Sequence, residues 1–165
     1  MLNTERDLLD KAHKVNWTIW LAIIVFLLSL VGVALSVAPG TEEGEGEIFK
    51  FVLFFPSLVI PLALIQVRRA MFRIDPKKPL AESPDQAFAA GINNYRRVSV
   101  VSMALAEVIG LNGFVIYFVA GDFTLLIVSM ILALLVFLYI RPSRSDLQDY
   151  ARAHRDHPRF QNTHL

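Results

Sequence analysis

The sequence contains no cysteine, which excludes disulfides, thiol catalysis and cysteine-ligated metal sites. Its four histidines lie only in the polar segments near the two ends. His154 and His157 have a helical spacing, but such a pair without supporting ligands does not make a zinc site. The sequence also lacks a phosphate-binding glycine loop, a nucleophile elbow and a zinc-binding helix. We therefore predict that the protein is not an enzyme and holds no metal and no cofactor.

Charge is also scarce: charged residues make up 19% of the chain, and the formal net charge is +1. This balance gives no electrostatic reason to expect a nucleic-acid partner. Hydrophobic residues make up 55% of the chain, which exceeds the roughly 45–50% that is usual in soluble domains. The excess is concentrated in long apolar runs, so the lipid bilayer is the first partner that we predict.

The apolar residues form four runs, each close to the roughly 20 residues that a helix needs to cross the hydrocarbon. Their bounds are about 17–38, 48–67, 98–119 and 123–140. Trp17 and Trp20 begin the first run, where an aromatic belt is expected. This run also resembles a signal peptide, but the acidic residues before it and Pro39 after it argue against cleavage. We predict an all-α polytopic membrane protein whose four transmembrane helices lie within a membrane domain at 17–141.

Three polar segments accompany this membrane domain, at 1–16, 68–97 and 142–165. The first has apolar positions at helical spacing and predicts an amphipathic surface helix that leads into the first span. The third predicts a short helix over 146–154, because Ser145 and Gln148 have the spacing of a capping box.

The connection at 68–97 contains a second helix start. Ser83 is placed as an N-cap and is followed by Pro84 at the first helical position. Apolar side chains then recur at helical spacing and predict one packed face, made by Phe88, Ile92 and Tyr95. We expect this helix to lead into the third span, with Gly91 as a possible break.

Basic residues decide the predicted orientation. All of them except Lys50 lie in, or directly beside, the three polar segments, whereas the connection at 39–47 is acidic. The positive-inside rule then places both termini and the loop at 68–97 on the cytoplasmic side. The prediction is a multi-pass protein of the inner membrane with its N- and C-termini in the cytoplasm.

Glu107 is the single ionisable residue in the apolar stretch from Val98 to Gly121. Ionisable groups inside a membrane are costly, and they usually face a protein interior, a partner or a water-filled cavity. Three roles for this protonatable group are open at this stage. It could be an interhelical hydrogen-bonding residue, a proton or cation site, or a contact with a partner subunit.

The midpoints of the four runs place one polar residue of each at a similar depth: Ser29, Ser57, Glu107 and Ser129. We take these four as the candidate proton or ion site, in which Glu107 would donate a hydrogen bond to a serine hydroxyl. Asn112 points to the other side of the third helix, and we predict that it bonds a neighbouring helix.

The third run also carries a stripe of small residues: Ser99, Ser102, Ala106, Gly110 and Gly113. Such stripes let two membrane helices approach closely, so we predict that this stripe packs against another helix. In the second run, Pro56 and Pro61 remove backbone donors and predict a kinked helix.

Residues 104–113 read ALAEVIGLNG, with a small residue before the glutamate and glycines after it. Over residues 102–119 the chain resembles the carboxylate-bearing helix of rotary ATPase proteolipid (c-type) subunits. The resemblance implies that Glu107 binds and releases a proton or a sodium ion. The second run lacks the repeated glycines of that family's first helix, so the resemblance is confined to one helix and does not imply a rotor-ring subunit.

Our leading hypothesis is a non-catalytic integral membrane protein, an accessory or assembly subunit organised around Glu107. Its partners would be other membrane subunits or further copies of the chain. The first alternative is an oligomeric, proteolipid-like protein that conducts protons or cations through Glu107. The second is a binder of lipid or of a small apolar ligand, with the kink at Pro56 and Pro61 as a lateral opening.

Overall fold

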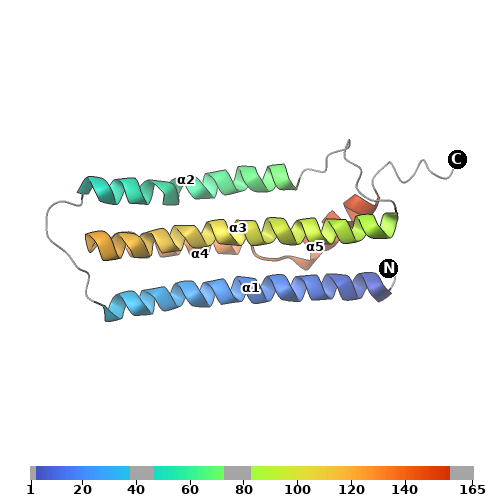
Figure 1. Cartoon of the computed structure of the whole chain (residues 1–165), viewed down its shortest axis with the longest axis horizontal. Helices are drawn as coiled ribbons and strands as arrows, with labels where there is room; N and C mark the ends of the chain where they lie inside the picture. Colours follow the sequence, from blue (N-terminus) through green and yellow to red (C-terminus); the bar gives the residue numbers. More distant parts are fainter. Residues whose placement is uncertain (1–2, 38–46, 73–82, 157–165) are drawn as a thin grey trace. The chain divides into compact units, whose positions relative to one another are not determined.

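The computed structural model describes residues 3–37, 47–72 and 83–156, and Figure 1 labels five helices in them. The helices are α1 (Asn3–Ser36), α2 (Glu47–Met71), α3 (Pro84–Ala120), α4 (Phe123–Tyr139) and α5 (Arg144–Arg155). Together they hold 92% of the described residues, and these residues include no strand. The predicted all-α class is therefore confirmed.

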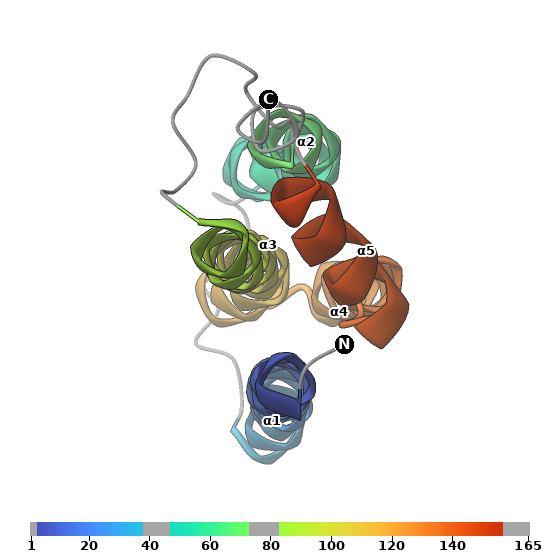
Figure 2. The same ribbon diagram turned by 90° about the vertical axis from the view of Figure 1, so that its right-hand side faces the viewer.

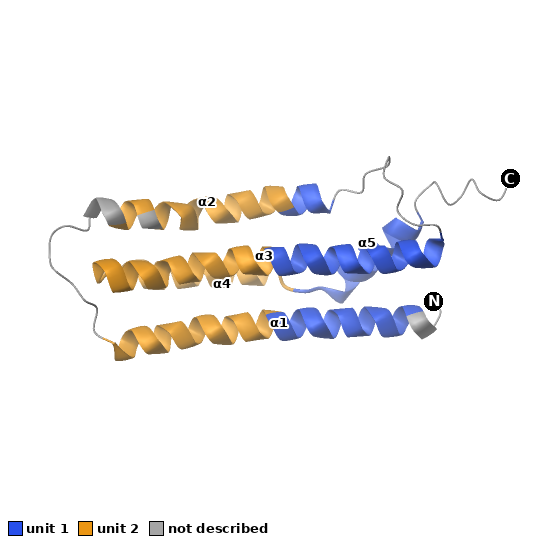
Figure 3. Cartoon of the chain, in the orientation of Figure 1, with its two compact units in different colours: residues 1–19, 68–101, 142–165 blue, residues 20–67, 102–141 orange. Residues whose placement is uncertain are grey.

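The chain divides into two compact units, which Figure 3 colours separately. Unit 1 combines residues 1–19, 68–101 and 142–165, and unit 2 combines residues 20–67 and 102–141. Unit 2 takes in most of the four apolar runs, whereas unit 1 takes in the polar segments. The boundary between the units therefore follows the hydropathy of the sequence. The division into a membrane domain at 17–141 and polar parts around it stays a prediction.

Three described helices are long and apolar enough to cross a membrane: α1, α2 and α3. α3 has 37 residues and is about 55 Å long at 1.5 Å per residue, well beyond the roughly 30 Å of hydrocarbon. α4 has 17 residues and reaches the required length only when α5 is counted with it. Several long apolar helices of this kind are compatible with a membrane protein.

In unit 2, α1 contributes buried residues at heptad spacing to the core. Trp20, Leu27 and Ala34 are seven residues apart and are all buried, which is the spacing of a helix that packs along its length. The indole Nε1 of Trp20 donates to the carbonyl of Phe137 on α4, at 3.0 Å. The hydroxyl of Tyr117 on α3 lies 2.8 Å from the carbonyl of Ala34 and is buried beside it. These side chains satisfy polar groups that hydrocarbon or a dry core would leave unpaired.

A tight turn of Gly121 and Asp122 joins α3 to α4. Gly121 has φ of 66°, a left-handed conformation that glycine adopts without a steric penalty. Asp122 is the N-cap of α4, and its carboxylate accepts a hydrogen bond from the amide of Leu125 at 3.0 Å. The same carboxylate lies 3.7 Å from the ammonium of Lys50 on α2.

Unit 1 has its own core, in which α1, α3 and α5 pack together. Its fully or nearly buried members are Leu9, Ala12, Phe88, Ile92, Tyr95, Leu147 and Ala151. The face predicted from the spacing of Phe88, Ile92 and Tyr95 is confirmed. Both ends of α5 are joined to α1 by ion pairs, Arg144 with Asp10 at 2.6 Å and Arg155 with Glu5 at 3.3 Å. Figure 2 shows α5 after a turn of 90° from the view of Figure 1.

The helix starts in unit 1 agree with the sequence in one place and differ in another. The hydroxyl of Ser83 accepts from the amide of Gln86 at 3.3 Å, as predicted for the start of α3. α5 begins two residues earlier than expected, with Ser143 instead of Ser145 as its N-cap. The hydroxyl of Ser143 accepts from the amide of Asp146 at 3.3 Å, and this start places the negative charge of Asp146 in the first turn, where the helix dipole favours it.

Gly91 does not break α3, which continues through it. A Cβ atom at this position would lie 3.0 Å from the Cα of Ala151 and 3.1 Å from the Cβ of His154. The glycine therefore allows α5 to approach α3 closely.

Candidate functional site

Glu107, the centre of the predicted site, lies in the part of α3 that belongs to unit 2 and is half-buried. Its neighbours Ala104 and Val108 are exposed, so the carboxyl sits beside an outward-facing strip of apolar residues. Within the described ranges, Glu107 takes part in no hydrogen bond and no ion pair. The carboxyl is therefore available to a group outside this chain.

The three serines predicted at the same depth have different surroundings. Ser29 is exposed, and its hydroxyl donates to the carbonyl of Phe26 on its own helix at 2.6 Å. Ser57 on α2 is fully buried and accepts a hydrogen bond from Asn112. Ser129 on α4 is fully buried, and its hydroxyl has no partner in the part of the chain that the structure describes. None of these hydroxyls is hydrogen-bonded to Glu107.

Asn112 provides a polar contact between α2 and α3. Its Nδ2 donates to the hydroxyl of Ser57 at 3.3 Å, in line with the interhelical role predicted for it. Both residues lie in unit 2, where a buried amide without such a partner would be costly.

The stripe of small residues on α3 is buried, with Ser99, Ser102 and Ala106 at most 2% exposed. Gly110 faces Leu27 on α1: a Cβ at this glycine would lie 2.6 Å from the Cδ2 of Leu27. Gly113 faces Ser129 on α4, where an added Cβ would lie 2.4 Å from the Cβ of Ser129. The two glycines therefore stand where neighbouring helices approach α3 most closely.

The two prolines lie inside α2, which continues through both of them. Beside Pro61, a cavity of about 180 Å³ lies between α2 and α4, and its other lining residues are Leu64, Ile65, Leu135, Val136 and Tyr139. The lining is almost entirely apolar, so this cavity could take an acyl chain or a side chain but offers no polar recognition.

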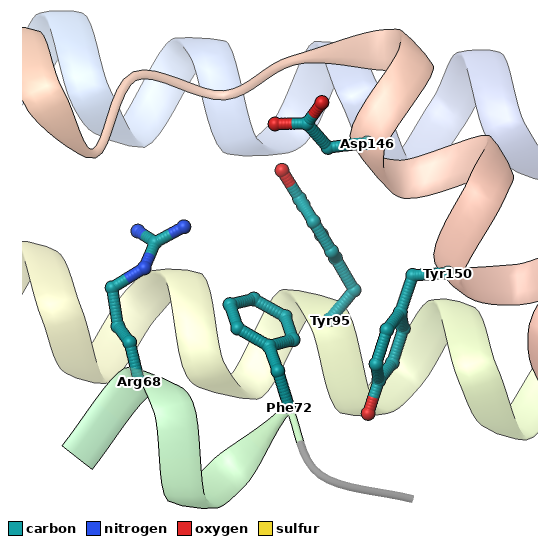
Figure 4. Close-up of a pocket in the computed structure, with 5 residues that line it drawn as sticks. All are labelled: Arg68, Phe72, Tyr95, Asp146 and Tyr150. Carbon is teal, nitrogen blue, oxygen red and sulfur yellow. The ribbon is translucent and has the colours of Figure 1, made fainter. Parts of the chain in front are cut away.

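A polar pocket that the sequence reading missed lies in unit 1. Its volume is about 260 Å³, and its walls come from the end of α2 and the residue after it, from α3 and from α5. Figure 4 shows the residues that line it, Arg68, Phe72, Tyr95, Asp146 and Tyr150. The three segments are far apart in the chain and share no motif.

Aromatic rings form the wall of this pocket. The ring centroids of Phe72 and Tyr150 are 5.1 Å apart, and those of Phe72 and Tyr95 are 5.5 Å apart. The phenol of Tyr150 accepts from the Nδ2 of Asn94 at 2.5 Å. Burial raises the pKa of the Tyr150 phenol and the hydrogen bond from Asn94 lowers it, with burial the larger effect, so the phenol is neutral near pH 7.

Two opposite charges share the rim of the pocket. The guanidinium of Arg68 lies 5.2 Å from the ring centroid of Phe72, yet its Nη1 is buried and has no hydrogen-bond partner among the described residues. The carboxylate of Asp146 is exposed, and the two groups lie on different sides of the Tyr95 hydroxyl in Figure 4. In the described part of unit 1, no ion pair joins Arg68 to Asp146.

The described residues contain no group of three or more histidine, cysteine or acidic side chains that could hold a metal ion. His154 is buried against α3, and its Nδ1 lies 3.1 Å from the carbonyl of Tyr150. His157 lies outside the described residues.

Comparisons with known proteins add nothing to this geometry: no protein-family model, no curated protein and no solved structure matches the chain. Function must therefore be argued from the residues themselves.

Proposed function

We propose that this protein is a non-catalytic, multi-pass protein of the inner membrane that serves as an accessory or assembly subunit of a membrane complex. In this proposal α4 is a fourth span. Its 17 residues extend about 26 Å, at the short end of what crosses the hydrocarbon. The basic residues then gather on the cytoplasmic side with both termini.

The observation that carries the proposal is the outward position of Glu107. An ionised carboxylate at the centre of a membrane helix costs about 2.5–3.5 kcal/mol on insertion scales. A neutral carboxyl that faces lipid still leaves a hydrogen-bond donor without an acceptor. No described residue of the chain meets this demand, and we assign the missing hydrogen-bond partner to a second protein.

The surface around Glu107 fits such a partner. Val101, Ala104, Val108 and Val115 are exposed on α3 and are short or β-branched, so they form a smooth surface for another helix. We propose that the occupant is a transmembrane helix of another subunit that offers a hydrogen-bond acceptor at the depth of Glu107. A second copy of this chain is one of the outcomes that the experiment below separates.

The test is the composition of particles extracted from native membranes into polymer nanodiscs without detergent. The wild-type chain should be recovered in particles that contain a second polypeptide. Glu107→Leu should shift the chain to single-chain particles, whereas Glu107→Gln, which still forms hydrogen bonds, should keep most of the association. Val59→Leu is the matched control, because Val59 is exposed on α2 and is remote in sequence from Glu107.

Recovery of single chains from wild-type membranes would rule out the proposal, as would unchanged association in Glu107→Leu. Particles that contain only this chain would identify the partner as a second copy. Reporter proteins fused to each terminus test the orientation, and both should report the cytoplasm.

A second candidate function is conduction of protons or cations. The absence of a partner for Glu107 among the described residues favours it, because an unpaired carboxyl is open to an ion. This function predicts ion flux in proteoliposomes that disappears in Glu107→Gln. It also predicts carbodiimide labelling of Glu107 that falls as pH rises or that sodium prevents. Labelling and flux would both be absent if Glu107 serves only as a contact.

A further inference from the structure

The side chain of Arg68 has a buried hydrogen-bond donor without an acceptor among the described residues. The Nη1 atom of its guanidinium is buried and has no partner among the residues that the structure describes. A buried donor without an acceptor is unfavourable, and the preferred partners of guanidinium are carboxylate and phosphate oxygens, which it binds bidentately. Asp146 lines the same pocket without pairing with Arg68, so the space beside the guanidinium suits an anionic group that comes from elsewhere.

The opposite rim of the pocket suits a cation. The carboxylate of Asp146 is exposed, and among the described residues of unit 1 it accepts a hydrogen bond only from the hydroxyl of Ser145, at 3.5 Å. The rings of Tyr95 and Tyr150 lie beside it, with centroids 6.3 Å apart. An exposed carboxylate attracts an ammonium group and accepts charge-assisted hydrogen bonds from its N–H donors.

The positive charge of Arg68 and the negative charge of Asp146 together favour a ligand that carries both signs of charge. Asp146 would repel a ligand that is only anionic, and Arg68 would repel one that is only cationic. A compact ligand that carries both a phosphate and an ammonium suits both residues. The volume of about 260 Å³ is below the roughly 300–1,000 Å³ of sites for drug-sized molecules and therefore fits a compact group.

The position of Arg68 in the sequence indicates where such a group would come from. It is the first residue after the apolar run at 48–67, at the level where a membrane helix meets lipid headgroups. We infer that the pocket formed by Arg68, Tyr95 and Asp146 binds a phosphoethanolamine group, with the phosphate at Arg68 and the ammonium at Asp146. The group could belong to a phosphatidylethanolamine lipid or to a soluble phosphoethanolamine compound.

This inference predicts that three lipids bind the protein with different affinities. Phosphatidylcholine keeps the phosphate, but its methylated ammonium has no N–H to donate to Asp146. Phosphatidylglycerol keeps the phosphate and has no ammonium at all. Native mass spectrometry of the full chain, titrated in detergent with each of the three lipids, should show tightest binding of phosphatidylethanolamine.

Three variants separate the site from general basic attraction. Arg68→Gln should weaken binding of phosphatidylethanolamine about ten- to hundredfold, because it removes charge-assisted hydrogen bonds to the phosphate. Arg69→Gln is the matched control: Arg69 is exposed on the same turn of α2, so the loss should stay below about fivefold. Asp146→Asn, at an exposed position that is not needed for packing, should abolish the preference for phosphatidylethanolamine over phosphatidylcholine.

A parallel titration with soluble O-phosphoethanolamine identifies the source of the group. Binding of the soluble compound alone, lost in Arg68→Gln, would keep the inference and assign a soluble ligand. Tighter binding of phosphatidylglycerol, or equal losses in the Arg68 and Arg69 variants, would overturn it and indicate unspecific basic attraction. Absence of binding by all four compounds would also overturn it. These results do not depend on Glu107, so they leave the proposed function untouched.

Discussion

Gly113 offers the sharpest test of the packing in unit 2. In Gly113→Ala, the new Cβ would lie 2.4 Å from the Cβ of Ser129 and 3.2 Å from the carbonyl oxygen of Leu126. Carbon atoms pack best at about 3.5–4.0 Å, so the added methyl group is more than 1 Å too close. The Cβ of Ser129 is fixed to its backbone and cannot rotate away, so α3 and α4 would have to separate.

Two opposing effects determine how much Gly113→Ala changes the free energy of unfolding. Overpacking of this kind costs about 1–3 kcal/mol, while replacing glycine by alanine inside a helix gains about 0.5–1 kcal/mol. We expect Gly113→Ala to lower the free energy of unfolding by about 0.5–2 kcal/mol. Gly32→Ala is the control, because nothing lies within 4 Å of its added Cβ, and it should stabilise the protein by about 0.5–1 kcal/mol.

The assay is reversible unfolding in mixed micelles of mild detergent and sodium dodecyl sulfate, followed by far-UV circular dichroism. Gly110→Ala should fall between the two variants, because its added Cβ meets the end of the Leu27 side chain, which can turn away. Ser129→Gly should rescue much of the loss in Gly113→Ala, with an interaction energy in the double-mutant cycle of about 0.5–3 kcal/mol. Equal stabilities of Gly113→Ala and Gly32→Ala would refute the close approach of α3 and α4.

Two further predictions concern single polar groups, and the same unfolding assay measures both. Asn16 in unit 1 is 1% exposed, and neither its Nδ2 nor its Oδ1 has a partner among the described residues. Asn16→Leu should therefore raise the free energy of unfolding by about 1–3 kcal/mol. A loss of stability in this variant would show that the amide is hydrogen-bonded. Asp122→Ala should lower stability by about 0.5–2 kcal/mol through loss of the cap of α4, and Asp122→Asn should restore most of it, because asparagine caps helices equally well.

The sequence predicts most of the helical framework because the signals for helix starts and ends are local. Ser83 lies next to the helix that it caps, and Gly121 with Asp122 marks the turn between α3 and α4. The start of α5 was missed by two residues because Ser143 and Ser145 both offer a hydroxyl, and the choice depends on Asp146. The sequence alone suggests a helix break at Gly91, whereas the glycine lets α5, a segment distant in the chain, approach α3 closely.

The surroundings of Glu107 could be predicted only in part. Counting residues from the ends of a span gives the depth of a side chain and not the direction in which it points. Ser29 shows the difference: it lies two positions after Leu27, which is buried, and therefore points to the opposite side of α1. The depth of a serine in its span therefore does not show whether its side chain faces Glu107, and none of the three serines is hydrogen-bonded to Glu107.

The pocket at Arg68 could not be predicted because it needs tertiary contacts. Arg68, Tyr95 and Asp146 come from three segments with no shared motif. The one signal in the sequence was the recurrence of Tyr95 on an apolar face, and it predicted packing without indicating a ligand.

The turn at Gly121 and Asp122 has a consequence for how the chain is made. Only these two residues separate α3 from α4, so no polar stretch exists that could stay in water while one helix inserts before the other. If α3 and α4 are both spans, as proposed above, two helices joined so tightly would enter the membrane as one hairpin, with the shorter α4 packed against α3. Lengthening this turn with a polar linker should therefore slow the appearance of correctly inserted protein during synthesis, although every contact in the finished molecule would remain possible.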